Sequence, residues 1–266
     1  VEVEQTPDLD NIDATGHELL NFKPELVKLL NEMPVRFQCI PDAQTYKFAI
    51  IAANQAEKRR KRQEKMGVAR INKGSLQWWE VALSLLRRMK EDGLKPDKQV
   101  YSSVISACES DGQWQRALGV LRSMSVTTGG EIPTPPNLFC FNSAIAACQK
   151  GGAWLEAVEL YERIRASGNR KIRPNFVTIN SLLIALEEGG QREMAESIYK
   201  EALHDDILLP WRARTGEAGE WLRVMDLHQY SVPLAKVAVR TALESLLTPR
   251  PQFTIDKDLV IIVGKG

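Results

Sequence analysis

An internal repeat constrains the fold of this chain more than any other feature of its sequence. The segment VISACESDGQWQRALGVLRSM from Val104 aligns with AIAACQKGGAWLEAVELYERI from Ala144, so that Cys108 matches Cys148. A third copy, LLIALEEGGQREMAESIYKEA from Leu182, aligns its Gly190 with Gly152. Each copy has the pattern of helix, glycine-containing turn and helix. Repeats of this kind, several tens of residues long, are typical of a helical solenoid.

An earlier copy of the repeat is split by an insertion. Tyr46 matches Tyr101 and Trp79 matches Trp114, but Tyr46 and Trp79 lie much further apart in the chain than their two counterparts do. The extra residues lie near 55–74, between the two helices of this copy, and they carry a run of basic residues: Lys58, Arg59, Arg60, Lys61, Arg62 and Lys65. Such a run is either a solvated loop or helix extension, or a surface that contacts RNA phosphates.

Composition limits the classes of protein to which the chain can belong. With 44% hydrophobic residues it can bury a core, and with 35 Lys and Arg against 34 Asp and Glu its charges nearly cancel. Any contact with nucleic acid must therefore come from local basic clusters. The four cysteines lack the spacing of a zinc site or a disulfide framework, and we predict that Cys108 and Cys148 are small buried apolar residues. We expect no cofactor, no metal and no membrane insertion.

The boundaries between the copies resemble those of a known family. The stretches LKPDKQVYSSVISAC, PPNLFCFNSAIAAC and RPNFVTINSLLIAL resemble the pentatricopeptide motif, over roughly residues 43–211. This resemblance implies an α-solenoid that reads one RNA base per helical repeat. Tetratricopeptide repeats are the nearest alternative, but they lack the proline followed by Asp or Asn at the boundary. The tryptophans at equivalent positions are most simply packing residues.

In this family, the fifth residue of a repeat and the last residue together touch a base edge. Transferred by position, these pairs are Lys47 with Asp97, Ser102 with Asn137, Asn142 with Asn175, and Asn180 with Trp211. By resemblance, the second pair favours adenine and the third favours a pyrimidine, with cytosine preferred. The apolar residues Phe139 and Val177 would pack against base faces. The alternative is that these polar residues only face solvent.

The segment after Trp211 has a different pattern. Residues 212–220 contain two glycines and read as a linker, and they are followed by a strand, a turn with Pro233, an amphipathic helix and a second strand. Residues 221–266 resemble the start of a small MutS-related (SMR) domain, with the sequence MDLH ending at His228 and a final Gly-Lys-Gly. The resemblance implies that Asp226 and His228 take part in proton transfer or phosphate positioning, and that Lys265 binds phosphate. A local hydrogen-bonded Asp–His pair is the simpler alternative.

Together these patterns predict a mainly α protein: an α-solenoid of helix-turn-helix repeats followed by a partial small α/β domain. The expected boundaries are an N-terminal helical segment or degenerate repeat at 1–42, repeats at 43–97, 98–137, 138–175 and 176–211, a linker at 212–220, and the start of an SMR domain at 221–266. Because the chain begins at Val1 and its last residues read as an interrupted motif, we expect a fragment or a processed form.

The function that this reading favours is an organellar RNA-binding adaptor, in a chloroplast more than in a mitochondrion. Its expected partners are single-stranded or ribosomal RNA, together with the proteins of a larger ribonucleoprotein. Two alternatives remain: an endoribonuclease that uses the SMR domain at a site chosen by the repeats, and a scaffold whose repeats bind protein.

Overall fold

The computed structural model describes most of the chain after its N-terminal segment. The described residues are 30, 32–34, 38–66, 77–125, 134–215, 221–247 and 260–262. The chain divides into two compact units, Val1–Gly151 and Gly152–Gly266.

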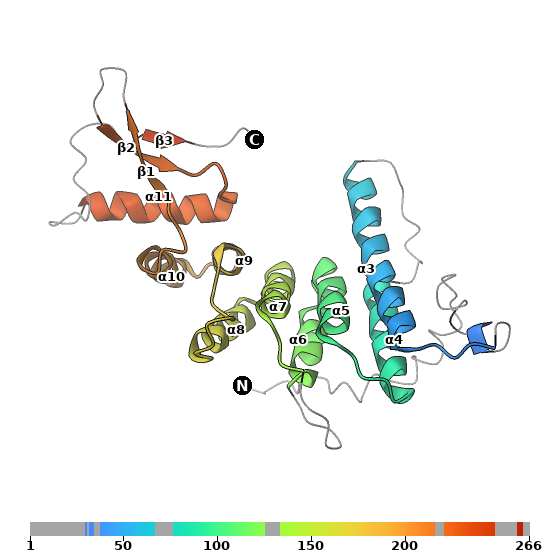
Figure 1. The fold of residues 1–266 in the computed structure, drawn as a ribbon. Helices are drawn as coiled ribbons and strands as arrows, with labels where there is room; N and C mark the ends of the chain where they lie inside the picture. The colour runs from blue at the N-terminus through green and yellow to red at the C-terminus, as the bar shows by residue number, and fades with distance from the viewer. Residues whose placement is uncertain are drawn as a thin grey trace. The chain divides into compact units, whose positions relative to one another are not determined.

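The first unit is built from stacked helices (Figure 1). Its helices are α3 (Ala43–Lys65), α4 (Trp78–Glu91), α5 (Lys98–Ser110), α6 (Trp114–Ser123) and α7 (Leu138–Lys150). Helix α5 packs on both α3 and α4, and α7 packs in the same way on α5 and α6. In this unit, the first helices α5 and α7 therefore each cover both helices of the repeat before them.

Apolar residues at helical spacing account for this stacking. In α4, Val81, Leu85 and Met89 follow one another at four-residue intervals and are no more than 2% exposed. Cys108 in α5 is fully buried, and burial raises the pKa of its thiol to about 12. Cys148 is also fully buried, so both cysteines pack as small apolar residues, as predicted. Burying one aliphatic side chain of this size contributes about 1.5–3 kcal/mol.

The glycines that recur in the sequence lie in the turns between paired helices. Gly112 has a φ of 65° in the first unit, and Gly152 and Gly190 each have a φ of 72° in the second. This left-handed conformation strains any residue that has a Cβ atom, so glycine is favoured at each turn. Alignment of the copies thus located the turns correctly.

The recurring tryptophans pack against the next repeat, as predicted. A Cβ atom added to Gly151 would lie 2.3 Å from Cδ1 of Trp114, and one added to Gly189 would lie 2.6 Å from Cδ1 of Trp154. Each indole ring therefore lies directly on the backbone of a glycine at the end of a first helix. The glycine is required there for space and not for its backbone conformation, because only a glycine leaves room for the ring.

The second unit combines helices with a small sheet. Its elements are α8 (Trp154–Ala166), α9 (Phe176–Glu188), α10 (Arg192–His204), β1 (Trp211–Thr215), β2 (Trp221–Asp226), α11 (Val232–Leu247) and β3 (Val260–Ile262). The strand order is β1-β2-β3, with β1 antiparallel and β3 parallel to β2. The predicted succession of strand, helix and strand is present in β2, α11 and β3.

One expectation for this segment is corrected by the sheet. Residues 212–215, which the sequence places in a linker, belong to β1, where Trp211 pairs with Met225 and Thr215 with Trp221. A lone five-residue segment has no strong tendency to form a strand, and here the backbone of β2 supplies the hydrogen-bonding partner. The glycines that suggested a linker come after β1.

Helix α11 joins the α/β segment to the last repeat. It packs on α9 and α10, with Leu234, Val237 and Ala238 fully buried, and in Figure 1 the sheet lies on its other side. Arg240 donates to Glu187 at 2.6 Å and also pairs with Glu196. The fold is therefore mainly α, with helix-turn-helix repeats followed by a small α/β element, as predicted. Its assignment to the SMR family stays a prediction.

Candidate nucleic-acid interface

The first helix of every repeat carries a polar residue at the same place. α3 begins at Ala43, α5 at Lys98, α7 at Leu138 and α9 at Phe176, and the residue four positions further on is polar in each. These residues are Lys47, Ser102, Asn142 and Asn180. All four side chains are half-buried. The regular register gives each repeat one polar side chain at the same height of its first helix.

The second residue of each of the first three predicted pairs caps the helix that follows. Side-chain oxygens of Asp97, Asn137 and Asn175 accept hydrogen bonds from backbone N–H groups three residues later, at 2.8, 2.9 and 3.1 Å respectively. Asp and Asn are preferred at this position because they satisfy an N–H group that the helix leaves unpaired. Sequence reasoning missed this role, although the Pro-Asp and Pro-Asn boundaries are typical helix starts.

Capping limits what these side chains can offer to a base. An Asn cap uses the amide oxygen, and its amide nitrogen carries two further donors, whereas a capping Asp offers no donor. Asn137 and Asn175 thus combine a structural role with the chemistry needed to bind a base edge. The prediction that they read bases and the observation that they cap helices are compatible.

The fifth residues Lys47 and Asn180 each contact a residue at the start of a following helix. Lys47 donates through Nζ to Oδ2 of Asp97 at 2.7 Å. Partial burial raises the pKa of Asp97, but hydrogen bonds from Lys47 and from the backbone of Val100 lower it overall. In the second unit, the Ser231 hydroxyl donates to Oδ1 of Asn180 at 2.6 Å. Lys47 and Asn180 thus each lie within hydrogen-bonding distance of a residue that precedes a helix.

The pairing of Asn180 with Trp211 stays a prediction, and Trp211 does not occupy the capping position of the other second residues. Trp211 begins β1 and is paired with Met225, so it does not precede a helix. Each earlier repeat is followed by the first helix of another repeat, whereas the fourth repeat is followed by a strand. A strand has no helix N-terminus, so its first residue cannot act as a cap. Asn180 instead contacts Ser231, which lies just before α11.

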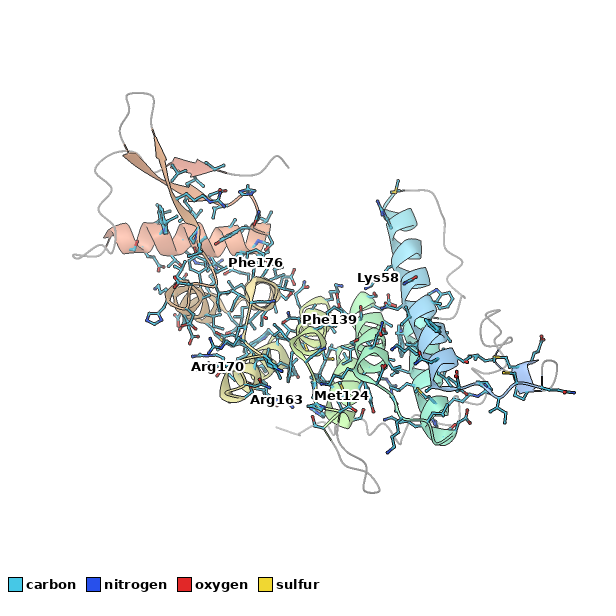
Figure 2. All side chains as sticks on the ribbon, in the orientation of Figure 1. Lys58, Met124, Phe139, Arg163, Arg170 and Phe176 are labelled. Atoms are coloured by element: carbon cyan, nitrogen blue, oxygen red, sulfur yellow. The ribbon has the colours of Figure 1, made fainter. Side chains whose placement is uncertain are left out.

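Two of the large apolar side chains exposed on these first helices lie at the second position of a helix. Phe139 and Val177 are the second residues of α7 and α9, and they are 54% and 52% exposed; Phe139 is labelled in Figure 2. The equivalent positions Gln44 and Gln99 are exposed as well. Exposed rings and aliphatic groups of this kind can pack against the faces of unstacked bases. Their exposure leaves them accessible to a base, and their packing against bases stays a prediction.

The basic insertion begins as an extension of α3. In the repeat alignment, the end of α5 at Ser110 matches Gln55, but α3 continues to Lys65 and so gains about 15 Å over its last ten residues. Lys58 and Arg62 lie one turn apart on this extension and both are exposed; Lys58 is labelled in Figure 2. The remaining predicted phosphate contacts lie outside the described residues: the side chains of Arg59, Arg60, Lys61 and Lys65, and the whole of Lys265.

A second basic segment spans the end of α8 and the turn that follows it, and the sequence interpretation did not single it out. Its exposed cations are Arg163, Arg165, Arg170, Lys171 and Arg173, of which Arg163 and Arg170 are labelled in Figure 2. Arg165 pairs with Glu201, and a turn closed by Asn169 precedes the cap of α9. The density of Arg and Lys around residue 170 could have identified this segment.

The predicted catalytic residues form a local pair. Asp226 ends β2 with a side chain only 8% exposed. Its carboxylate accepts hydrogen bonds from the backbone N–H of His228 at 3.2 Å and from Nδ1 of the same residue, and it forms an ion pair with Arg212 at 3.2 Å. Hydrogen bonding to His228, and to a lesser extent the charge of Arg212, lowers the pKa of Asp226. A carboxylate held in this way is a weak proton acceptor.

Two further features bear on the classes of site that the protein can contain. Within the described ranges, no three His, Cys, Asp or Glu side chains are grouped so that they could hold a metal ion. None of the described helices is both long and apolar enough to cross a membrane.

Comparison with known families identifies the repeats. A pentatricopeptide repeat domain model matches residues 84–151, and a single-repeat model of the same type matches residues 139–169. Residues 84–169 therefore match pentatricopeptide repeats. No curated protein matches its sequence.

Two solved structures share the fold. The pentatricopeptide repeat protein PPR10, in complex with an 18-nucleotide psaJ RNA element, is 24% identical with a TM-score of 0.50, over 73% of this chain and 24% of PPR10. Nuclear proteinaceous RNase P 2 (PRORP2) from A. thaliana is 13% identical with a TM-score of 0.53, over 88% of this chain and 41% of that protein. This chain thus spans less than half the length of either structure, and similarity at this level shows the fold alone.

Proposed function

We propose that this protein binds single-stranded RNA through the first helices of its repeats. The observation that carries this proposal is the register: each first helix presents a polar fifth residue, and a polar residue caps the first helix that follows. Rigid helices fix these side chains in place, so a base edge finds its hydrogen-bonding partners already oriented. PPR10, which shares the fold, was solved with bound RNA.

Each pair would contact one base. Ser102 with Asn137 would favour adenine, and Asn142 with Asn175 would favour a pyrimidine, with cytosine preferred. Hydroxyl and amide groups donate and accept at a base edge, and Phe139 would pack against the face of a neighbouring base. At the first position, the ion pair of Lys47 with Asp97 engages both side chains, so we expect weaker base selection there.

Phosphate contacts would come from the two basic segments. Lys58 and Arg62 are exposed on the α3 extension, and Arg170, Lys171 and Arg173 are exposed after α8. Because the total charges nearly cancel, attraction to RNA depends on these local groups. Such contacts position the strand without selecting its sequence.

The small number of repeats limits how many RNA bases the protein can recognise. A stack of four repeats offers too few base positions to define a unique transcript site, so the protein would act as an adaptor inside a larger ribonucleoprotein. We place it in an organelle, in the chloroplast more than in the mitochondrion, where it would hold a transcript or ribosomal RNA. This placement depends on the resemblance of the repeats and tail to plant and algal organellar proteins.

RNA cleavage is the second candidate, because Asp226 and His228 lie in contact at the end of a strand. Two hydrogen bonds from His228 and an ion pair with Arg212 already engage the Asp226 carboxylate, which favours a structural role. The Asp226→Ala variant distinguishes the two. If the protein cleaves RNA, this variant loses cleavage and keeps binding; if it is an adaptor, neither form cleaves RNA.

Ultraviolet crosslinking of the native protein, followed by sequencing of the bound RNA, tests the proposal. We expect crosslinks concentrated on one transcript or one segment of ribosomal RNA. An Asn142→Ala variant should lose part of this enrichment. Recovery of stable protein partners without RNA would reject the proposal and favour a protein-binding scaffold.

A further inference from the structure

Helix α11 occupies the place of a first helix in a fifth repeat. In the first unit, α5 packs on α3 and α4, and α7 packs on α5 and α6. In the second unit, α11 packs on α9 and α10, which are the two helices of the last repeat. The α/β element therefore continues the stacking pattern, although its sequence is not that of a repeat.

Ser231 stands where the earlier repeats have their cap. Its carbonyl oxygen accepts the backbone N–H of Ala235 at 2.8 Å, and its hydroxyl oxygen lies 3.4 Å from the N–H of Leu234. Asp97, Asn137 and Asn175 make the same two bonds, to the N–H groups four and three residues later. By this criterion Ser231 is the cap of α11.

Ser231 also makes the contact that joins a fifth residue to the next cap. Its hydroxyl donates to Oδ1 of Asn180 at 2.6 Å, which parallels the 2.7 Å contact between Lys47 and Asp97. The neighbouring rings of Phe176 and Tyr230 lie 5.9 Å apart, and Arg240 ties α11 to Glu187 of α9. These contacts hold Ser231 beside α9.

We propose that Ser231 completes a fourth base-recognition pair with Asn180, so that the non-repeat element extends the RNA-reading surface by one position. The inference rests on the proposed function. The hydroxyl of Ser231 engages the oxygen of the Asn180 amide, and this orients the amide so that its N–H donors are available to a ligand. The base atom facing Asn180 is therefore a hydrogen-bond acceptor.

The chain supplies its own reference for the test. Asn142 is followed by the cap Asn175, and Asn180 is followed by the cap Ser231, so the two pairs differ only in the second residue. Ser231→Asn turns the fourth pair into a copy of the third, and Asn175→Ser does the reverse. Both Asn and Ser cap helices well, so neither exchange should unfold the protein.

The experiment is selection from a randomised RNA library with the full chain. Ser231→Asn should change the base preference at a single position, next to that of Asn142, by about fivefold, which is the effect of one hydrogen bond of ordinary strength. The new preference should equal that of the third position in the wild type. Trp211→Phe, which keeps an aromatic residue in β1, should leave every preference unchanged.

Three outcomes of this selection distinguish the fourth pair from the proposed function itself. A single-position change with Ser231→Asn, with unchanged thermal unfolding, supports the fourth pair. If Asn175→Ser alters base choice and Ser231→Asn does not, the fourth pair is rejected and the proposed function stands. If the wild-type chain enriches no sequence, the proposed function fails, and the fourth pair fails with it.

Discussion

At the residue scale, the contact between Gly189 and Trp154 makes a sharp prediction. A Cβ atom at Gly189 would lie 2.6 Å from Cδ1 and 2.9 Å from Cγ of the indole ring. Gly189→Ala should therefore lower the free energy of unfolding by about 1–3 kcal/mol, the usual cost of overpacking a core. Thermal and urea unfolding of the variant would measure this loss.

The adjacent glycine provides the control. Gly190 has a φ of 72° and open space where a Cβ atom would lie. Gly190→Asn should cost little, because Asn tolerates the left-handed conformation better than other residues with a Cβ atom. Equal losses for the two variants would contradict the assignment of Gly189 to packing and Gly190 to the turn.

Individual residues differ in how far the sequence predicts them. The turn glycines were predictable because they align between copies. The packing role of Gly189 was not, since it depends on a ring contributed by Trp154, which lies in the preceding repeat. The caps Asn137 and Asn175 were identified only as candidate base readers, although their side chains also satisfy the start of a helix. Position in a motif does not distinguish these roles, because one side chain can perform both.

At the element scale, the extension of α3 makes the second prediction. Lys58 and Arg62 are exposed one turn apart, so one RNA strand can meet both charges. The Lys58→Glu, Arg62→Glu double variant should weaken RNA binding and reduce the slope of log K against log salt concentration by about 1.4, or about 0.7 for each lost phosphate contact on single strands. Binding titrations at several salt concentrations would measure the slope.

A control variant separates the effect of changing the net charge from the effect of changing charges on the α3 extension. Arg122 is exposed at the end of α6, and Arg122→Glu changes the net charge without touching the extension. It should leave the slope nearly unchanged. A slope that the double variant does not alter would show that the α3 extension is a solvated helix without RNA contacts.

The sequence predicted the secondary-structure elements correctly where apolar residues recur periodically. The paired helices were predictable because apolar residues recur at helical spacing and glycines separate the copies. Two elements were not resolved by this reasoning. The insertion could be a loop or a helix extension until α3 was seen to continue to Lys65. Strand β1 was interpreted as a linker because its pairing partner β2 lies further along the chain. The residues of one strand alone indicate little about the strand with which it pairs.

At the scale of the whole molecule, a helix from outside the repeats covers the end of the repeat stack. A solenoid buries each repeat between its neighbours, so the last repeat needs a covering element. Helix α11 supplies it by packing on α9 and α10. The sequence predicted the order of strand, helix and strand, but not that the helix would take the place of a repeat. The sequence also did not identify Ser231 as a cap, because the helix that it begins does not carry the repeat motif.

Arg240 tests how far this covering helix stabilises the last repeat. Its side chain is 27% exposed and pairs with Glu187 and Glu196, which are 13% and 14% exposed. Arg240→Met should cost about 1–3 kcal/mol, because it leaves two partly buried carboxylates without their cation. Hydrogen exchange should show lost protection in α9, α10 and α11. The helices of the first unit should keep theirs, since coupling in a repeat stack is mainly between neighbours.

Two further variants separate this ion-pair cluster from a general effect of charge. Lys236→Met removes a cation from the same helix, outside this ion-pair cluster, and should leave protection unchanged. Adding Glu187→Gln and Glu196→Gln to Arg240→Met removes the unpaired charges and should restore part of the stability. Uniform loss of protection across both units would contradict the view that α11 stabilises its neighbours locally. No recovery in the triple variant would instead show that Arg240 acts through the packing of its aliphatic stem.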